Sequence, residues 1–383
     1  MNKFLELISR GIHQIQRTFF PDLEHEAGPI PESLIQLTYI FETVHSQKIL
    51  LPERCWTGRP PKSRRGILNA FIAKSFLNMP TTSHLVERLQ SDKHLRLICG
   101  FDSRRDVPSE SSFSRVFAEF AKTEIPQRIH EALIKQHCAE GIIGHISRDA
   151  TAIEAREKAA KKAQPETSSP KPIKRKGRPR KGETLSTKEP TRIQKQMHMT
   201  LAEMLKDLPT VCNVGSKKNS QGYVETWVGY KLHVDTADTS IPISAILTSA
   251  SLHDSQAAIP LATISSTRVQ NFYELMDSAY DVPDIAKYCR NLNRVPLIDT
   301  NPRRNTGLQE YEEHEGKARK TLNWNPAEEI RYKERTRAER TNARLKDEFG
   351  GRTVRVRGAT KVFCHLMIGI LVLTADQLIR LIR

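Results

Sequence analysis

The spacing of apolar residues divides the chain into a helical first part and a mixed remainder. Up to about residue 140, apolar side chains recur every three or four positions, as they do over residues 5–15 and 113–120. Prolines and small polar residues separate these runs, which predicts short helices joined by turns over residues 1–140. Such helices are compatible with a helix-turn-helix unit and equally with any helical bundle.

Strand patterns begin after residue 140. Alternation or a short apolar run predicts five strands, at 141–151, 230–235, 241–248, 272–276 and 295–299. A turn at 237–240 makes the second and third strands antiparallel neighbours. Helices are predicted at 256–264, at 283–290 and over 332–346, and the apolar run 362–375 reads as a core helix.

Composition restricts the partners rather than the fold. The formal net charge is +16, so polyanions are the expected ligands, nucleic acid first and an anionic membrane surface second. The longest apolar run is shorter than the roughly 18 residues of a membrane span. The six cysteines include no C-x2-C pair, which indicates reduced thiols and gives no zinc-finger pattern.

One segment differs from the rest in composition. Residues 156–195 contain 14 Lys or Arg against 4 Asp or Glu and few apolar residues, so we expect a disordered basic insertion, extending over about 156–220. Within it, residues 174–182 read K-R-K-G-R-P-R-K-G and resemble an AT-hook. That resemblance implies that Arg178 and Arg180 lie in the minor groove of A·T-rich DNA. A nonspecific basic linker is the alternative.

Two aspartates stand where predicted strands end. Asp149 closes the first strand and is followed by small residues, a position from which a carboxylate can reach a metal. Asp277 closes the strand at 272–276. Asp281 is its rival, although its place at a helix start fits an N-cap better. Asp254 or Ser255 is the expected cap of the helix at 256–264, and capping is also the alternative for Asp149.

The helix predicted over 332–346 carries the remaining candidate chemistry. At about 100° per residue, Tyr332, Arg335, Glu339 and Lys346 fall on one narrow stripe. A single carboxylate flanked by two cations and a phenol suits a site that holds a metal and grips phosphates. A solvated helix with ion pairs along its surface is the alternative.

The spacing Tyr-x2-Arg-x3-Glu-x6-Lys resembles the signature helix of the DDE transposases of bacterial insertion sequences. The resemblance implies an α/β RNase H-like catalytic domain with a mixed sheet over 141–383, preceded by an all-α DNA-binding region over 1–140. It also implies that Asp149, Asp277 and Glu339 are the catalytic acids and hold Mg²⁺, for which Mn²⁺ can substitute. Carboxylate oxygens are the ligands that Mg²⁺ prefers.

The same resemblance assigns the cations. Arg335 and Lys346 would hold terminal phosphates, Tyr332 would contact a nucleotide, and Arg352 would contact the DNA backbone. The implied partners are double-stranded DNA, both element ends and target, and a second copy in a homodimer. The implied location is the bacterial cytoplasm, at the nucleoid, with no membrane. A structure-specific nuclease on this fold and a noncatalytic DNA-binding protein derived from a transposase are the alternatives.

Overall fold

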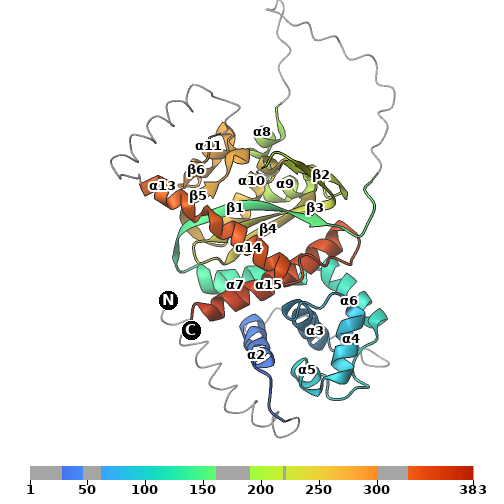
Figure 1. The fold of residues 1–383 in the computed structure, drawn as a ribbon. Helices are drawn as coiled ribbons and strands as arrows, with labels where there is room; N and C mark the ends of the chain where they lie inside the picture. The colour runs from blue at the N-terminus through green and yellow to red at the C-terminus, as the bar shows by residue number, and fades with distance from the viewer. Residues whose placement is uncertain (1–27, 46–61, 161–189, 219–220, 301–326, 383) are drawn as a thin grey trace, which may run out of the picture.

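A long central strand, β1 (Ile142–Glu154), organises the structure. The computed structural model describes residues 28–45, 62–160, 190–218, 221–300 and 327–382. In it a mixed sheet is surrounded by helices, an arrangement compatible with an α/β nuclease-like domain (Figure 1).

The sheet has six strands with both parallel and antiparallel neighbours. They are β1, β2 (Asn213–Lys218), β3 (Val224–Ala237), β4 (Pro242–Ser249), β5 (Gln270–Met276) and β6 (Val295–Ile298). The order is β2-β3-β1-β5-β6, and β4 also pairs with β3. The β1–β5 and β5–β6 pairs are parallel, whereas β3 is antiparallel to β1, β2 and β4. All five predicted strands are therefore present, and β3 and β4 are antiparallel as predicted.

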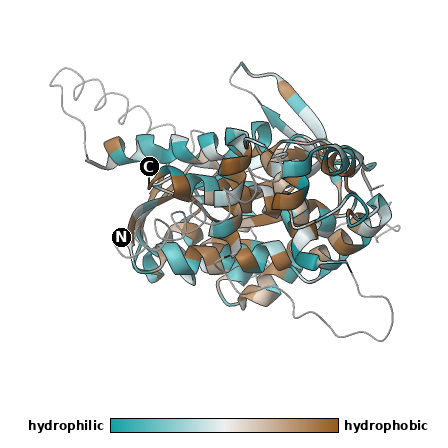
Figure 2. Ribbon diagram, turned by 90° about the horizontal axis from the view of Figure 1, so that it is seen from below, coloured by the Kyte–Doolittle hydropathy of each residue, from teal (hydrophilic) through white to brown (hydrophobic). Residues whose placement is uncertain are grey.

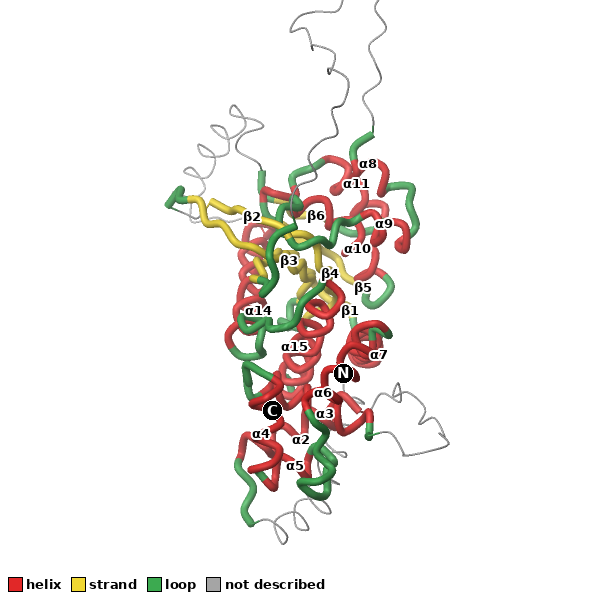
Figure 3. Tube along the Cα trace, turned by 90° about the vertical axis from the view of Figure 1, so that its right-hand side faces the viewer, coloured by secondary structure: helices red, strands yellow, loops and turns green. Residues whose placement is uncertain are grey.

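The long strand β3 serves two neighbours along one edge. Its first half pairs with β2 and its second half with β4, and the β2–β3 hairpin projects from the body of the protein (Figure 3). At Gly229 the backbone has a φ of +155°, and a Cβ there would lie 2.1 Å from the carbonyl oxygen of Ile153 on β1. Glycine is therefore needed where the β1 backbone approaches most closely.

The described residues before β1 contain helices and no strand. The helices are α2 (Glu32–His45), α3 (Arg64–Phe76), α4 (Thr82–Ser91), α5 (Lys93–Ile98), α6 (Glu110–Lys122) and α7 (Ile125–Cys138). In α6 the predicted apolar side is buried, including Phe113 and Phe120. The prediction of short helices is confirmed for these residues, while residues 1–27 and 46–61 lie outside the described part.

The apolar C-terminal run forms the core helix α15 (Ala359–Arg380). It is long and apolar enough to cross a membrane, but 83% of its most apolar window is buried inside the protein. It packs against α2, α3, α6, α7 and β4, and the ribbon coloured by hydropathy shows hydrophobic residues concentrated toward the middle of the molecule (Figure 2). Residues of the first helices and of the sheet therefore share one hydrophobic cluster through α15.

Helices α14 (Thr336–Asp347) and α10 (Ala258–Ser266) cover different faces of the sheet. On one face, α14 packs on β1 and β3. On the other, α10 packs on β3 and β4. Asp149 contacts α14, whereas the network around its neighbour Arg148 includes Ser265 of α10. The alternation of a strand thus separates the charged neighbours 148 and 149.

Three predicted boundaries were wrong. Residues 192–218, assigned to a disordered insertion, form α8 (Arg192–Gln196), α9 (Leu201–Asp207) and β2, because Thr191 and Thr200 make capping boxes and Met204 is buried. The strand carrying Asp149 continues to residue 154, because its partner β3 also continues. Residues 161–189 and 301–326 lie outside the described part.

The third wrong boundary concerns the signature helix, which is not continuous. It consists of α13 (Ala327–Tyr332), a 3-10 turn η3 (Lys333–Arg335) and α14. The tighter turn rotates Tyr332 relative to the stripe on α14.

Candidate active site

Asp149 and Asp277 are brought together by the register of two parallel strands. The last paired residues of β1 and β5 are Ser147 and Leu275. Two residues further along each chain come Asp149 and Asp277, at the carboxyl edge of the pair. The parallel pairing stops two residues before each aspartate, so the two carboxylates lie at the same edge of the pair, within electrostatic reach of each other.

Asp149 is largely buried and held by an amide. Its Oδ2 accepts a hydrogen bond from Asn342 Nδ2 on α14 at 3.0 Å. Burial raises the pKa of the Asp149 carboxyl, while the N–H of Ala150 and the Asn342 amide lower it; the charge of Asp277 raises it further. The net shift is upward, as expected for a buried acid facing a second acid.

Asp277 follows β5 directly and caps a short 3-10 turn, η2 (Ser278–Tyr280). Its carboxylate accepts from the N–H of Ala279 at 3.0 Å. Burial raises its pKa above the ordinary value, and the negative charge of Asp254 adds to this, while the Ala279 N–H and Arg335 pull it down. The predicted N-cap role of Asp281 was wrong, because the N-cap residue of helix α11 (Pro283–Asn291) is Val282. The aspartate that caps is Asp277, at the start of the 3-10 turn η2.

Glu339 lies in the first turn of α14 and is 51% exposed. Its Oε1 accepts from Arg335 Nη2 at 2.9 Å. Glu334, on the 3-10 turn η3 that precedes α14, pairs instead with Arg337. Of these two glutamates, Glu339 is therefore the one paired with Arg335, whose charge also lowers the pKa of Asp277.

Arg335 interacts electrostatically with all three acids. Burial works to lower its pKa, but the charges of Tyr332, Glu339 and Asp149 give a net upward shift. The same guanidinium pulls down the pKa of Asp277. Its central carbon lies 5.9 Å from the centre of the Tyr332 ring. The structure thus brings Asp149, Asp277, Glu339, Arg335 and Tyr332 to one place.

Further cations surround this group. Lys217, from the projecting β2–β3 hairpin, lowers the pKa of both aspartates. Lys346 is half-buried, and its pKa is lowered by burial first and then by Arg352 and Lys217, while Asp347 and Glu154 oppose the shift. Arg352 pairs with Asp347 and is itself 68% exposed. Arg178 and Arg180 lie outside the described residues.

Several residues of the site carry no obvious sequence signal. Asn342 follows Glu339 by three positions, so helical spacing could have placed both on one face. Asp254 does not cap a helix as predicted; its Oδ1 accepts from Lys231 Nζ at 2.8 Å. The Tyr280 hydroxyl is buried and finds no hydrogen-bond partner among the described residues. Burial, then the charges of Asp254 and the two site aspartates, raises the pKa of Tyr280 well above its ordinary value.

The donor atoms suit a hard divalent cation in part. Asp149 and Asp277 offer carboxylate oxygens whose mutual repulsion is relieved by a cation, and Mg²⁺ prefers such ligands. Within the described ranges, however, no three His, Cys, Asp or Glu side chains gather closely enough to form a closed metal site. The third acid, Glu339, is turned to Arg335 instead.

Comparison with known protein families decides the identity of this arrangement. Residues 145–375, more than half of the chain, match the family described as Transposase DDE domain. The chain belongs to the DDE-type insertion sequence transposases. Residues 31–119 of this transposase also match a family described as Transposase domain (DUF772). Searches of curated proteins and of solved structures found no match.

Proposed function

We propose that this DDE transposase binds the terminal inverted repeats of its insertion sequence and catalyses metal-dependent DNA cleavage and strand transfer. The observation that carries the proposal is the juxtaposition of Asp149 and Asp277, two acids whose pKa values burial raises above the ordinary value, beside Arg335 and Glu339. Perturbed acids that converge from separate elements are typical of catalytic sites.

The strand order supports an RNase H-like domain over 141–383. The antiparallel run β4-β3-β1 continues into the parallel strands β5 and β6, and β2 extends the hairpin with β3. The acids then come from the central strand, from the adjacent parallel strand and from a helix that covers them. Helices α2–α7 would form the region that recognises DNA ends, within residues 1–140.

Asp149, Asp277 and Glu339 are the residues that would hold Mg²⁺, or Mn²⁺ in its place. When bound, the metal supplies Lewis-acid activation of the attacking and leaving oxygens. The protein orients these ligands with hydrogen bonds that also favour their ionised form. The Asn342 amide donates to Asp149, and the Ala279 N–H donates to Asp277. For Glu339 to reach the aspartates, its carboxylate has to leave Arg335.

The surrounding cations have a separate task. Lys217, Arg335, Lys346 and Arg352 lie around the acids, on β2, on η3, on α14 and in the turn after it. Positive charges of this kind hold DNA phosphates, because they replace condensed counterions. Tyr332, beside Arg335, offers an aromatic face for a nucleotide. A homodimer would place one such site at each of two element ends, in the bacterial cytoplasm at the nucleoid.

The test uses DNA that carries the inverted repeats found beside the coding region. Purified protein is incubated with labelled end DNA and Mg²⁺, with and without EDTA, and cleaved and joined products are separated. We expect both products with Mg²⁺ and neither with EDTA. Cutting without joining would indicate a nuclease, binding without either product would indicate a noncatalytic DNA-binding protein, and full activity in EDTA would contradict the metal mechanism.

A further inference from the structure

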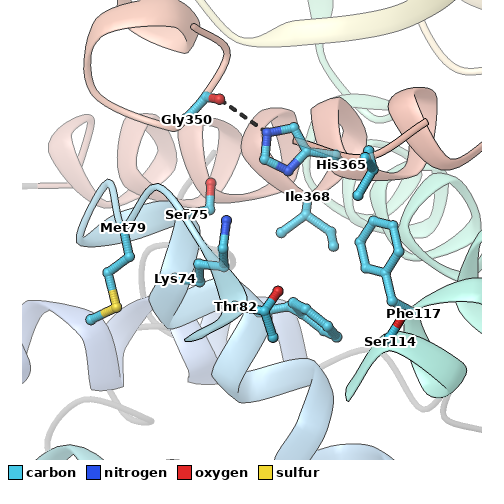
Figure 4. A pocket seen from close by; sticks show the side chains of 11 residues that line it. Lys74, Ser75, Met79, Thr82, Ser114, Phe117, Gly350, His365 and Ile368 are labelled. Atoms are coloured by element: carbon cyan, nitrogen blue, oxygen red, sulfur yellow. Dashed lines mark hydrogen bonds between the residues drawn. The ribbon is translucent and has the colours of Figure 1, made fainter. Parts of the chain in front are cut away.

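A cavity of about 90 Å³ lies where the first helices meet the C-terminal helix. Its walls come from α3, α4 and α6 on one side and from α15 and the turn at Gly350 on the other (Figure 4). Since a water needs roughly 10–15 Å³ by this kind of measure, there is room for several waters or for a small molecular anion. The acids and cations of the proposed active site do not line this cavity.

Among the described residues, Lys74 is the one side chain lining the cavity that carries a positive charge. Figure 4 shows its amine pointing from α3 toward α15. Burial lowers the pKa of Lys74 to about 8, and no carboxylate among the described residues contributes to its titration. The amine is therefore mostly protonated at neutral pH, and it forms no ion pair with a carboxylate among the described residues. Because the side chain is partly buried, an anion that enters the cavity would meet a cation that is not already neutralised.

Other polar groups line the cavity beside Lys74, and none of them neutralises its charge. Thr82, which is partly buried, and Ser114, which is exposed, line the cavity with hydroxyls that form no hydrogen bond to the described residues. His365 donates from Nε2 to the carbonyl oxygen of Gly350 at 3.0 Å. Burial, reinforced by the charge of Lys74, lowers the pKa of His365 to about 4. The ring is therefore neutral, and Lys74 alone sets the charge.

The backbone at the rim is shaped by the sequence. Gly350 has a φ of +82°, a conformation that other residues rarely adopt. It directs its carbonyl to His365, while the preceding carbonyl of Phe349 accepts from Ser75 Oγ at 2.9 Å. The turn is thus fixed to both α3 and α15. A ligand held here would touch the first helices and the catalytic part of the chain together.

We propose that this cavity binds a phosphate-type anion, with Lys74 as its counter-charge and the hydroxyls of Thr82 and Ser114 as hydrogen-bond donors. A phosphate offers several acceptor oxygens and negative charge, which matches one ammonium and two free hydroxyls. The group can be free inorganic phosphate or a phosphate of the DNA backbone, since their oxygens are alike.

The test measures thermal unfolding of the full chain in inorganic phosphate and in chloride at equal ionic strength. For the wild type we expect a saturable rise of Tm with phosphate. For Lys74→Met we expect the Tm in chloride to be unchanged or higher, because a partly buried cation without an ion-pair partner is removed, and the phosphate-specific rise to be lost. The matched control is Lys122→Met, which removes an exposed lysine from the last turn of α6 as Lys74 lies in the last turn of α3.

Two further measurements complete the test. Thr82→Val should weaken the phosphate response while keeping the fold, so the proposal stays testable if Lys74→Met does not fold. With sulfate, whose charge is constant, the response should fade as the pH rises above about 8, because Lys74 loses its proton while His365 stays neutral. Equal anion responses of wild type, Lys74→Met and Lys122→Met would overturn the proposal.

Duplex DNA distinguishes the two sources of phosphate. If the cavity receives a backbone phosphate, saturating DNA removes the free-phosphate response, and Lys74→Met binds DNA more weakly than Lys122→Met. If it receives free phosphate, the response persists with DNA and the two variants bind DNA equally. Both results support the anion site.

Discussion

At the residue scale, the central feature is that the register of β1 and β5 places two acids, 128 positions apart in the chain, at the same edge of the strand pair. Asp149 and Asp277 each stand two residues beyond the last paired position of their strands. Nothing in the local sequence around either residue encodes that match. Burial raises both pKa values, and a neighbouring carboxylate adds to each shift, Asp277 at Asp149 and Asp254 at Asp277, so both sites favour a bound cation.

The first prediction concerns Asn342, which donates to Asp149. Asn342→Ala removes a hydrogen bond to a carboxylate, a loss of about 1.5–3 kcal/mol or roughly 10- to 100-fold in the cleavage rate if the bond is kept in the transition state. Because the amide lowers the pKa of Asp149, its removal should move the acid limb of the rate profile to higher pH. Cleavage rates measured against pH provide the test.

The control for Asn342 is its neighbour on α14. The Thr341 hydroxyl is buried and makes no hydrogen bond among the described residues, so Thr341→Val should leave the rate and its pH dependence close to wild type. An Asn342→Ala enzyme with an unshifted acid limb would show that the amide does not act through Asp149.

At the element scale, three strands are tied by a buried charge network beneath the acids. Arg148 donates to Asp235 on β3 at 2.8 and 2.9 Å and pairs with Glu274 on β5 at 3.0 Å. Arg294 also pairs with Glu274, at 2.7 Å. Arg148 is 1% exposed. Because Arg148 precedes Asp149, the network fixes the strand that carries the first acid.

The second prediction is that Arg148→Met lowers the free energy of unfolding by about 3–5 kcal/mol, because Asp235 and Glu274 lose their buried partner. Urea unfolding measures the loss. The matched control is Arg64→Met, which breaks the Arg64–Glu119 pair; those side chains are 34% and 36% exposed, so about 1 kcal/mol or less is expected. Similar losses in the two variants would contradict the role of the network.

The strands and most helices could be predicted because their apolar patterns are local. Elements fixed by tertiary contacts could not. The predicted stripe of site residues on the signature helix required a continuous helix, but η3 interrupts that helix before α14. The strand β2 is polar and largely exposed. It is stabilised by pairing along β3 rather than by its own sequence. Asn342 and Lys217 join the site only through that packing.

At the scale of the whole molecule, residues 156–195, with 14 Lys or Arg against 4 Asp or Glu, supply most of the net charge of +16. Further cations, Lys217, Arg335 and Lys346, lie around the acids. Phosphate contacts release counterions, so affinity for end DNA should fall about 10-fold or more between roughly 50 and 200 mM salt. The third prediction is this fall, measured by titration of labelled end DNA. Affinity independent of salt would contradict the cationic surface.

The fourth prediction separates affinity from chemistry. Residues 164–188 contain eight Lys or Arg, and replacing them with a Gly/Ser linker of equal length should weaken binding to A·T-rich duplex and lower its salt dependence. Cleavage at saturating DNA should stay near wild type, because the proposed acids lie elsewhere. Loss of cleavage at saturation would instead make the segment part of the active site.

The central claim is that Asp149, Asp277 and Glu339 form one catalytic centre, and charge-removing variants test it most directly. Asp149→Asn, Asp277→Asn and Glu339→Gln should each lose cleavage and strand transfer by about 100-fold or more while binding end DNA like the wild type. Glu334→Gln, on the neighbouring turn and paired with Arg337, should stay active, as should Asp281→Asn. Full activity of Glu339→Gln, or an inactive Glu334→Gln beside it, would contradict the account.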